Sequence, residues 1–235
     1  MKTNEIGIEL KELGLRNQSV YRNLTVGELV DDIVANNEGL IGLRGAAMVD
    51  TGIYTGRSPK DKYIVDEQSS NSDIWWGPVN QKISEETFNE LYDQVTNFYN
   101  INSQSKTYVF DGFAGADPKH TLSIRIIAKK AWQAHFVHNM FIRPKGNQLE
   151  NFSPGFTIIN ASDFKNNRYK QYGMNSETFI VFHIKKRIAI IGGTEYGGEM
   201  KKGIFSILHY LLPKKNVLSM HCSANVDEKN NNPAI

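Results

Sequence analysis

Residues 178–203 read TFIVFHIKKRIAIIGGTEYGGEMKKG, and this stretch decides the fold class. Two runs rich in β-branched and aromatic residues, Thr178–Ile184 and Arg187–Ile191, flank the pair Lys185-Lys186, which predicts two strands joined by a tight hairpin. A glycine-rich segment follows and leads into a helix expected from Gly198 to Leu212, stopped by Pro213. Strands that pass directly into a helix indicate mixed α and β structure.

The rest of the chain alternates between helical and strand periods in the same way. Two helices are expected where apolar residues recur at helical spacing after a capping residue: 26–34 after Thr25 and 85–99 after Ser84. A third helix is expected at 130–140. Strands are expected at Ala46–Asp50, Lys62–Asp66, Thr107–Asp111, Leu122–Ala128, Phe156–Asn160 and Val217–Ser223. The predicted fold class is α/β, with a mixed sheet flanked by helices in one compact unit.

Composition is that of an ordinary globular protein. The 235 residues are 40% hydrophobic and 22% charged, and Lys plus Arg exceed Asp plus Glu by only two, so net charge gives no support to nucleic-acid or membrane-surface binding. The single cysteine, Cys222, excludes an intrachain disulfide and a cysteine-based zinc site. Residues 1–5 show no secretory signal and no apolar run is long enough to span a membrane, so we expect a soluble cytoplasmic protein.

The loop Thr55-Gly56-Arg57-Ser58-Pro59-Lys60-Asp61-Lys62 is the first candidate anion site. The planar guanidinium of Arg57 matches a carboxylate or phosphate bidentately, and Lys60 and Lys62 add positive charge. The alternative is a solvated loop in which Arg57 pairs with Asp50 or Asp61.

The second candidate is the start of the helix expected from Gly198. Lys201 and Lys202 fall in its first turn, where the helix dipole makes each cation unfavourable by ~0.3–1 kcal/mol. Two consecutive lysines there are explained if an anion lies in front of them and shares the ammonium groups and the free backbone N–H groups. The alternative is that Glu195 and Glu199 neutralise them at the surface.

The third segment is Ser219-Met220-His221-Cys222-Ser223-Ala224-Asn225, at the end of the last predicted strand. His221 could supply an imidazole to a metal or a phosphate, although a lone histidine does not make a site, and a lone Cys222 is more often an inert buried thiol. We interpret His135 and His138 as structural, and the pair Trp75-Trp76 as packing under a loop.

Taken together, these segments resemble the ATP-dependent phosphoenolpyruvate carboxykinase family. The matching motifs are residues 55–62, Tyr196–Gly203 and Met220–Asn225, in the family's order and approximate spacing, and the resemblance covers nearly the whole chain from Leu24 onward. The resemblance implies a lyase of gluconeogenesis that decarboxylates oxaloacetate and phosphorylates the enolate from ATP, giving phosphoenolpyruvate, CO2 and ADP. It implies small-molecule partners only, with no nucleic acid and no membrane.

The resemblance also implies residue roles. Arg57 and Tyr196 look like substrate-binding residues, and Lys202 is implied to bind substrate as well. Lys202 and His221 look like ligands of Mn2+ and contacts of the ATP γ-phosphate, with Mg2+ accompanying ATP. Lys201, Lys202 and His221 are the implied catalytic residues.

The chain departs from the family pattern at its C-terminus. The P-loop, a metal-binding aspartate and a further arginine, which follow in the family, do not occur in it, and no G-x-x-x-x-G-K-[ST] motif is present. We therefore expect residues 1–225 to be the N-terminal, substrate-binding domain and 226–235 to begin the missing nucleotide-binding C-terminal domain, with Pro233–Ile235 opening a strand. Two functions stay open: half of the carboxykinase, or a non-catalytic dianion-binding module.

The missing phosphate cradle gives a first testable expectation. We expect no measurable ATP affinity for this 235-residue chain, because no P-loop backbone is available to hold the phosphates. A calorimetric titration with ATP checks this, and micromolar binding would contradict it.

Overall fold

The structure is a computed structural model that describes residues 10–16, 18–227 and 233–234. The sequence-based expectations for residues 1–5, for the polar stretch 228–232 and for Ile235 lie outside the described residues. Within the described part, no helix has the length and apolar character needed to cross a membrane.

An eight-stranded mixed sheet forms the centre of the molecule, in the order β1-β6-β7-β8-β10-β9-β4-β5. Pairs β6·β7 and β10·β9 are antiparallel, and the other neighbours are parallel. The strands of this sheet are β1 (Ser19–Arg22), β4 (Lys62–Val65), β5 (Gln81–Ile83), β6 (Lys106–Ala114), β7 (Leu122–Ala128), β8 (Phe156–Ala161), β9 (Phe179–His183) and β10 (Ile188–Gly192).

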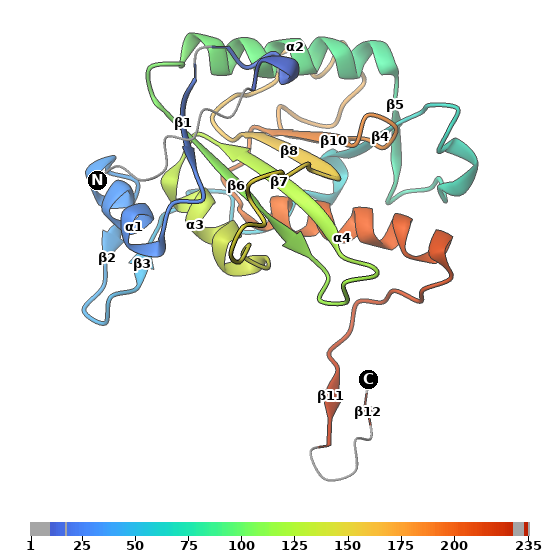
Figure 1. Ribbon diagram of the computed structural model, residues 1–235. Coiled ribbons are helices and arrows are strands. Elements are labelled where there is room, and N and C mark those ends of the chain that lie inside the picture. The colour runs from blue at the N-terminus through green and yellow to red at the C-terminus, as the bar shows by residue number, and fades with distance from the viewer. Residues whose placement is uncertain (1–9, 17, 228–232, 235) are drawn as a thin grey trace.

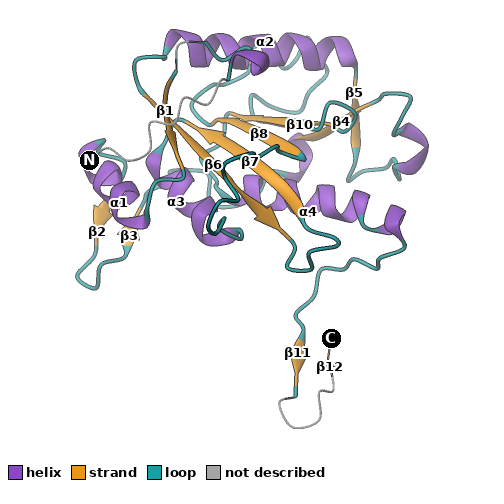
Figure 2. Ribbon diagram, in the orientation of Figure 1, coloured by secondary structure: helices purple, strands orange, loops and turns teal. Residues whose placement is uncertain are grey.

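In the described part of the chain, four α-helices surround the sheet: α1 (Val26–Ala35), α2 (Glu85–Ile101), α3 (Ala131–Met140) and α4 (Gly198–Leu211). Helix α2 lies along one face, whereas α3 and α4 lie on the opposite face (Figures 1 and 2). Helix α1 packs on α3 beside the sheet. The molecule is therefore a three-layer α/β/α arrangement, and the predicted mixed sheet flanked by helices is confirmed.

The layers follow from the two-residue period of the strands. Consecutive residues of one strand point to opposite faces of a sheet, so Ile190 packs in the cluster beneath α2 while Ile191 packs in the cluster beneath α4. Ile158 and Ile159 divide in the same manner. Because central strands bury both faces, they need apolar residues at every position, and β10 is buried throughout.

Helix starts are specified locally. The predicted capping box at α1 is present: Thr25 Oγ1 accepts from the Glu28 amide at 3.3 Å, and the Glu28 carboxylate accepts from the Thr25 amide at 2.8 Å. Ser84 caps α2 by accepting from the Thr87 amide at 3.1 Å.

Two strand predictions differ from the structure. The strand expected at Ala46–Asp50 is reduced to β3 (Ala47–Met48), which pairs only with β2 (Leu40–Ile41) in a small hairpin. The strand expected at Val217–Ser223 is absent: after 3-10 helix η4 (Pro213–Lys215) the chain leaves the body without a strand partner, and Leu218 is 79% exposed. Its alternating pattern therefore predicted a strand, but the segment pairs with neither edge of the sheet.

The end of the described chain forms a hairpin away from the sheet. Strand β11 (Asn225–Val226) pairs antiparallel with β12 (Pro233–Ala234), and both lie below the body of the molecule in Figure 1. The strand expected from Pro233 thus exists at 233–234, while the domain boundary at 225/226 stays a prediction.

Buried histidines predict how stability depends on pH. Burial, with the nearby charges of Arg143 and His135, lowers the pKa of His138 to about 4, and burial also lowers the pKa of His183. The unfolded chain takes up these protons near pH 6.5 and the folded chain only at lower pH, so stability should fall as pH decreases from 6.5 towards 4. Thermal unfolding at several pH values measures this loss, and each kcal/mol lost lowers Tm by about 2–4 °C. An NMR titration in which the His138 ring protonates near pH 6.5 would contradict the assignment.

Candidate functional site

The loop that carries Arg57 is anchored from beneath by a buried carboxylate. Asp61, in 3-10 helix η2 (Pro59–Asp61), is only 2% exposed and accepts from the Ser58 hydroxyl. It also accepts from Asn175 Nδ2 and Ser176 Oγ, each at 2.9 Å. These bonds fix the loop to the segment that precedes β9.

A second buried carboxylate joins the same loop to α4. Glu199, in the first turn of that helix, accepts from the Ser58 amide at 2.6 Å. Burial raises the pKa of the Glu199 carboxyl, and the Ser58 amide and the charges of Arg57 and Lys62 oppose that rise. This bond joins residues 141 positions apart in the sequence, and it holds the two candidate anion segments side by side.

Arg57 itself is exposed and close to the lysines. Desolvation lowers the pKa of both Lys62 and Lys202, and the charge of Arg57 lowers both further. In the part of the chain that the structure describes, no carboxylate lies within ion-pair distance of Arg57: Asp61 is engaged as above, and Asp50 accepts from the Gly52 amide at 2.7 Å. The alternative of a paired Arg57 is therefore wrong.

The two lysines of α4 are also without carboxylate partners among the described residues. Glu195 pairs with Lys130, which also binds Asp163 at 2.8 Å, and Glu199 is turned to Ser58. The alternative in which these glutamates neutralise Lys201 and Lys202 is therefore wrong. Desolvation, followed by the charges of Arg57 and Lys201, lowers the pKa of the Lys202 ammonium.

The backbone contributes less to this site than expected. The amides of Glu199 and Met200 donate to the carbonyls of Tyr196 and Gly197, at 3.1 and 3.2 Å, so they are not free for an anion. The expectation of shared N–H groups is wrong for these two amides, and cationic side chains make the positive surface.

Lys202 and His221 come together although 19 positions separate them. Lys202 Nζ lies 2.9 Å from His221 Nε2. Phe205, one turn after Lys202 on α4, contacts both side chains. Its ring centroid is 4.3 Å from Lys202 Nζ and 5.3 Å from the centre of the His221 ring. Cys222, beside His221, is exposed, so the interpretation as a buried thiol is wrong.

Tyr196 reaches this region through the glycine-rich loop. Its ring lies over Gly198, where an added Cβ would stand 2.3 Å from Tyr196 Cε1, so only glycine leaves room for it. Gly193 takes φ +66°, which bends the chain as it leaves β10. The predicted residues Arg57, Lys201, Lys202 and His221 thus gather at the N-terminal end of α4, with Tyr196 directly before it.

The remaining sequence candidates lie elsewhere. His135 and His138 are on α3, where His138 packs 6.1 Å from the Phe110 ring, in keeping with a structural role. The described residues contain no cluster of three or more His, Cys, Asp or Glu side chains suited to a metal. Trp76 packs as expected, and its indole N–H donates to the Asn71 carbonyl at 3.0 Å. Trp75 is 70% exposed, so the prediction that it packs under a loop is wrong.

Sequence reasoning missed three residues that shape the site. Asp61 and Glu199 position the loop and the helix, and Phe205 contacts both members of the Lys202–His221 pair. A signal existed only for Phe205, which follows Lys202 by three positions and so shares its helix face.

The fold and the site define an α/β protein with an unpaired cationic cluster at a helix N-terminus, suited to carboxylate and phosphate anions. The family model for phosphoenolpyruvate carboxykinase matches residues 18–235, and the chain belongs to that family.

Curated relatives support the assignment. The chain is 57% identical over 217 residues to phosphoenolpyruvate carboxykinase (ATP) of Leptospira biflexa, covering 92% of this chain and 40% of the relative. It is 51% identical over 222 residues to the protein of that name from Sulfurimonas denitrificans, covering 94% of this chain and 42% of the relative. It is 49% identical over 211 residues to the protein from Bacillus subtilis, covering 90% of this chain and 40% of the relative. The chain thus spans about two fifths of the length of these relatives.

Arg57→Lys tests the anion site directly. Lysine keeps the charge but loses the bidentate fork, so we expect oxalate, a small dicarboxylate probe, to bind at least about tenfold more weakly, or ~1.4 kcal/mol. Isothermal titration calorimetry measures the change, with Lys185→Met, which removes an exposed charge in the turn between β9 and β10, as a matched control that should leave binding unaltered. Equal oxalate affinity in wild type and Arg57→Lys would exclude Arg57 from the site.

Proposed function

We propose that the chain is the substrate-binding portion of an ATP-dependent phosphoenolpyruvate carboxykinase, which converts oxaloacetate and ATP to phosphoenolpyruvate, CO2 and ADP. It would supply the oxaloacetate/phosphoenolpyruvate site and part of the metal site, in the cytoplasm, on small-molecule substrates. The observation that carries the proposal is the 2.9 Å approach of Lys202 Nζ to His221 Nε2 beside the unpaired Arg57, in a chain of this family.

The donor pair fits a divalent transition metal such as Mn2+. Two nitrogen ligands at about 2.1 Å from one cation and at right angles lie about 3.0 Å apart, close to the observed Lys202–His221 separation. A lysine binds metal only as the neutral amine, and desolvation, followed by the charges of Arg57 and Lys201, lowers the pKa of Lys202 in that direction. When bound, the metal would act as a Lewis acid towards phosphoryl oxygens.

The chain's own residues would divide the remaining work. The exposed Arg57 guanidinium would grip a substrate carboxylate or phosphate, while Lys201 and Lys202 would balance negative charge on the transferred phosphoryl group. Tyr196, placed over Gly198, would contact the substrate on the side of the departing CO2. Phosphoryl transfer needs mainly positioning and cationic stabilisation, and this cluster provides groups for both.

Mn2+ binding tests the proposal on the chain as it exists. We expect weak binding that strengthens from pH 6.5 to 8.5, because the ligands must lose protons first, and that His221→Ala reduces at least tenfold. EPR of free Mn2+ measures it, and His120→Ala, which removes an imidazole from the loop between β6 and β7, is the matched control. Circular dichroism of each variant confirms that folding is retained.

Two results would count against the proposal. Equal Mn2+ affinity in wild type and His221→Ala would remove His221 from the metal site. Oxalate binding without any Mn2+ binding would favour the alternative function, a non-catalytic dianion-binding module.

A further inference from the structure

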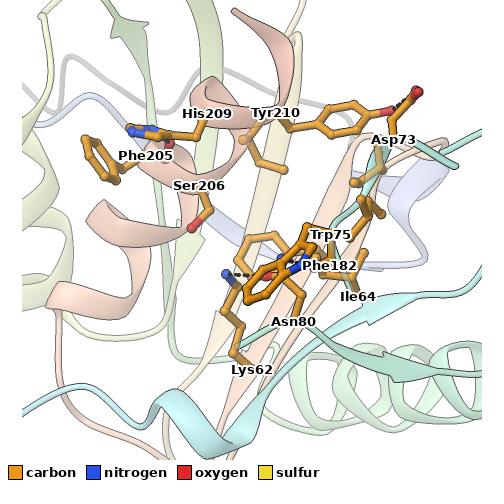
Figure 3. Close-up of a pocket in the computed structure, with 13 residues that line it drawn as sticks. Lys62, Ile64, Asp73, Trp75, Asn80, Phe182, Phe205, Ser206, His209 and Tyr210 are labelled. Atoms are coloured by element: carbon orange, nitrogen blue, oxygen red, sulfur yellow. Dashed lines mark hydrogen bonds between the residues drawn. The ribbon is translucent and has the colours of Figure 1, made fainter. Parts of the chain in front are cut away.

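A separate cavity of about 340 Å³ opens beside α4, on the flank formed by β4, β9 and the loop before β5 (Figure 3). Its lining is mostly apolar and aromatic, with Ile64 and Phe182 buried. Phe205 and Tyr210 come from α4, and Trp75 comes from the loop (Figure 3). A cavity of this size and composition suits a small ligand with one planar ring.

Lys62 supplies a cation to this cavity. Its side chain lines the cavity, where its Nζ donates to Asn80 Oδ1 at 3.3 Å (Figure 3), and desolvation followed by the charge of Arg57 lowers its pKa. Among the described residues, no carboxylate lies within ion-pair distance of Lys62; Glu199 acts on it only at longer range. A half-buried ammonium whose only bond is to a neutral amide is suited to an anionic ligand.

Trp75 gives the cavity an aromatic rim. Trp75 is 70% exposed, whereas the neighbouring Trp76 packs against Lys82, whose Nζ lies 4.6 Å from the centroid of the Trp76 ring. A large exposed indole beside an apolar cavity provides a stacking surface for a ring. The two tryptophans therefore divide their roles: Trp76 fixes the loop, and Trp75 is available for a ligand.

The far end of the cavity restricts the ligand's charge. Asp73 lines it there, bound by Lys214 and accepting from the Tyr210 hydroxyl at 3.4 Å (Figure 3). An aspartate at the end away from Lys62 is unfavourable for a second carboxylate on the same ligand. One cation, an aromatic wall and a distal aspartate select a ligand with a single acidic group and an uncharged body.

We propose that this cavity binds an aromatic monocarboxylate, with its carboxylate on Lys62 and Asn80 and its ring between Trp75 and the α4 side chains. This site is distinct from the dianion site, because its cation is Lys62 rather than Arg57, Lys201 and Lys202. Phe205 is the one residue that contacts both, since it lines the cavity and also contacts His221.

Phenylacetate is a suitable probe, and phenylacetamide is its uncharged match. We expect calorimetry to show phenylacetate binding with a Kd of about 1 mM or below, and phenylacetamide binding at least about tenfold more weakly. Lys62→Met should weaken phenylacetate at least tenfold, and Trp75→Ala should weaken both compounds. The exposed Lys60→Met and the dianion-site variant Arg57→Lys should bind phenylacetate as wild type does.

An NMR readout on the wild-type protein avoids dependence on variant folding. The chain has three tryptophans, and phenylacetate should shift the indole N–H signal of Trp75 while leaving that of Trp132 on α3 unchanged. Absence of binding at 10 mM (about ten times the expected Kd), equal affinity for acid and amide, or wild-type affinity in Lys62→Met would overturn the proposal. Loss of binding in Arg57→Lys would overturn it too, by placing the anion in the dianion site.

Discussion

Burial of β10 on both faces is the constraint on which the rest of the structure depends. Ile190 and Ile191 point to opposite faces, so the sheet requires α2 on one side and α4 on the other. Met200, Ile204 and Ile207 bury the inner face of α4 against the sheet, and only the short loop 193–197 connects strand and helix. The N-terminal end of α4, and with it the position of Lys201 and Lys202, is therefore fixed by the core.

Glu199 also fixes the position of the loop that carries Arg57, which is remote in sequence. It lies between Gly198 and Met200, so burying Met200 under the sheet also places the Glu199 carboxylate beside the Ser58 amide. Asp61 secures the other side of the same loop through Asn175 and Ser176. The Arg57 guanidinium is thus supported by two buried carboxylates, neither of which neutralises it, and a supported but unpaired cation is ready to bind an anion.

The sequence predicted local features well and three-dimensional neighbours poorly. The capping residues Thr25 and Ser84 and the β-branched run around Ile190 depend on near neighbours in the chain, and their helices and strand formed as predicted. Val217–Ser223 has a strand-like pattern but pairs with neither edge strand of the sheet, β1 or β5, which only the assembled topology determines. The pairing of Glu195 with Lys130, 65 positions away, was equally hidden, because either lysine of α4 was a nearer partner in sequence.

That pairing explains how the cationic cluster persists. Lys201 and Lys202 are the fourth and fifth residues of α4, and with an arginine close by they repel one another and oppose the helix dipole, so without a bound anion they are unfavourable. In a protein selected for stability alone, Glu195 and Glu199 would form ion pairs with these lysines. Here Lys130 pairs with Glu195 as well as with Asp163, and the Ser58 amide donates to Glu199, so both glutamates already have partners. An anion that binds only the folded chain offsets this electrostatic repulsion and stabilises the fold by mass action. The cluster also binds the anion more tightly, because no internal carboxylate has to be displaced first.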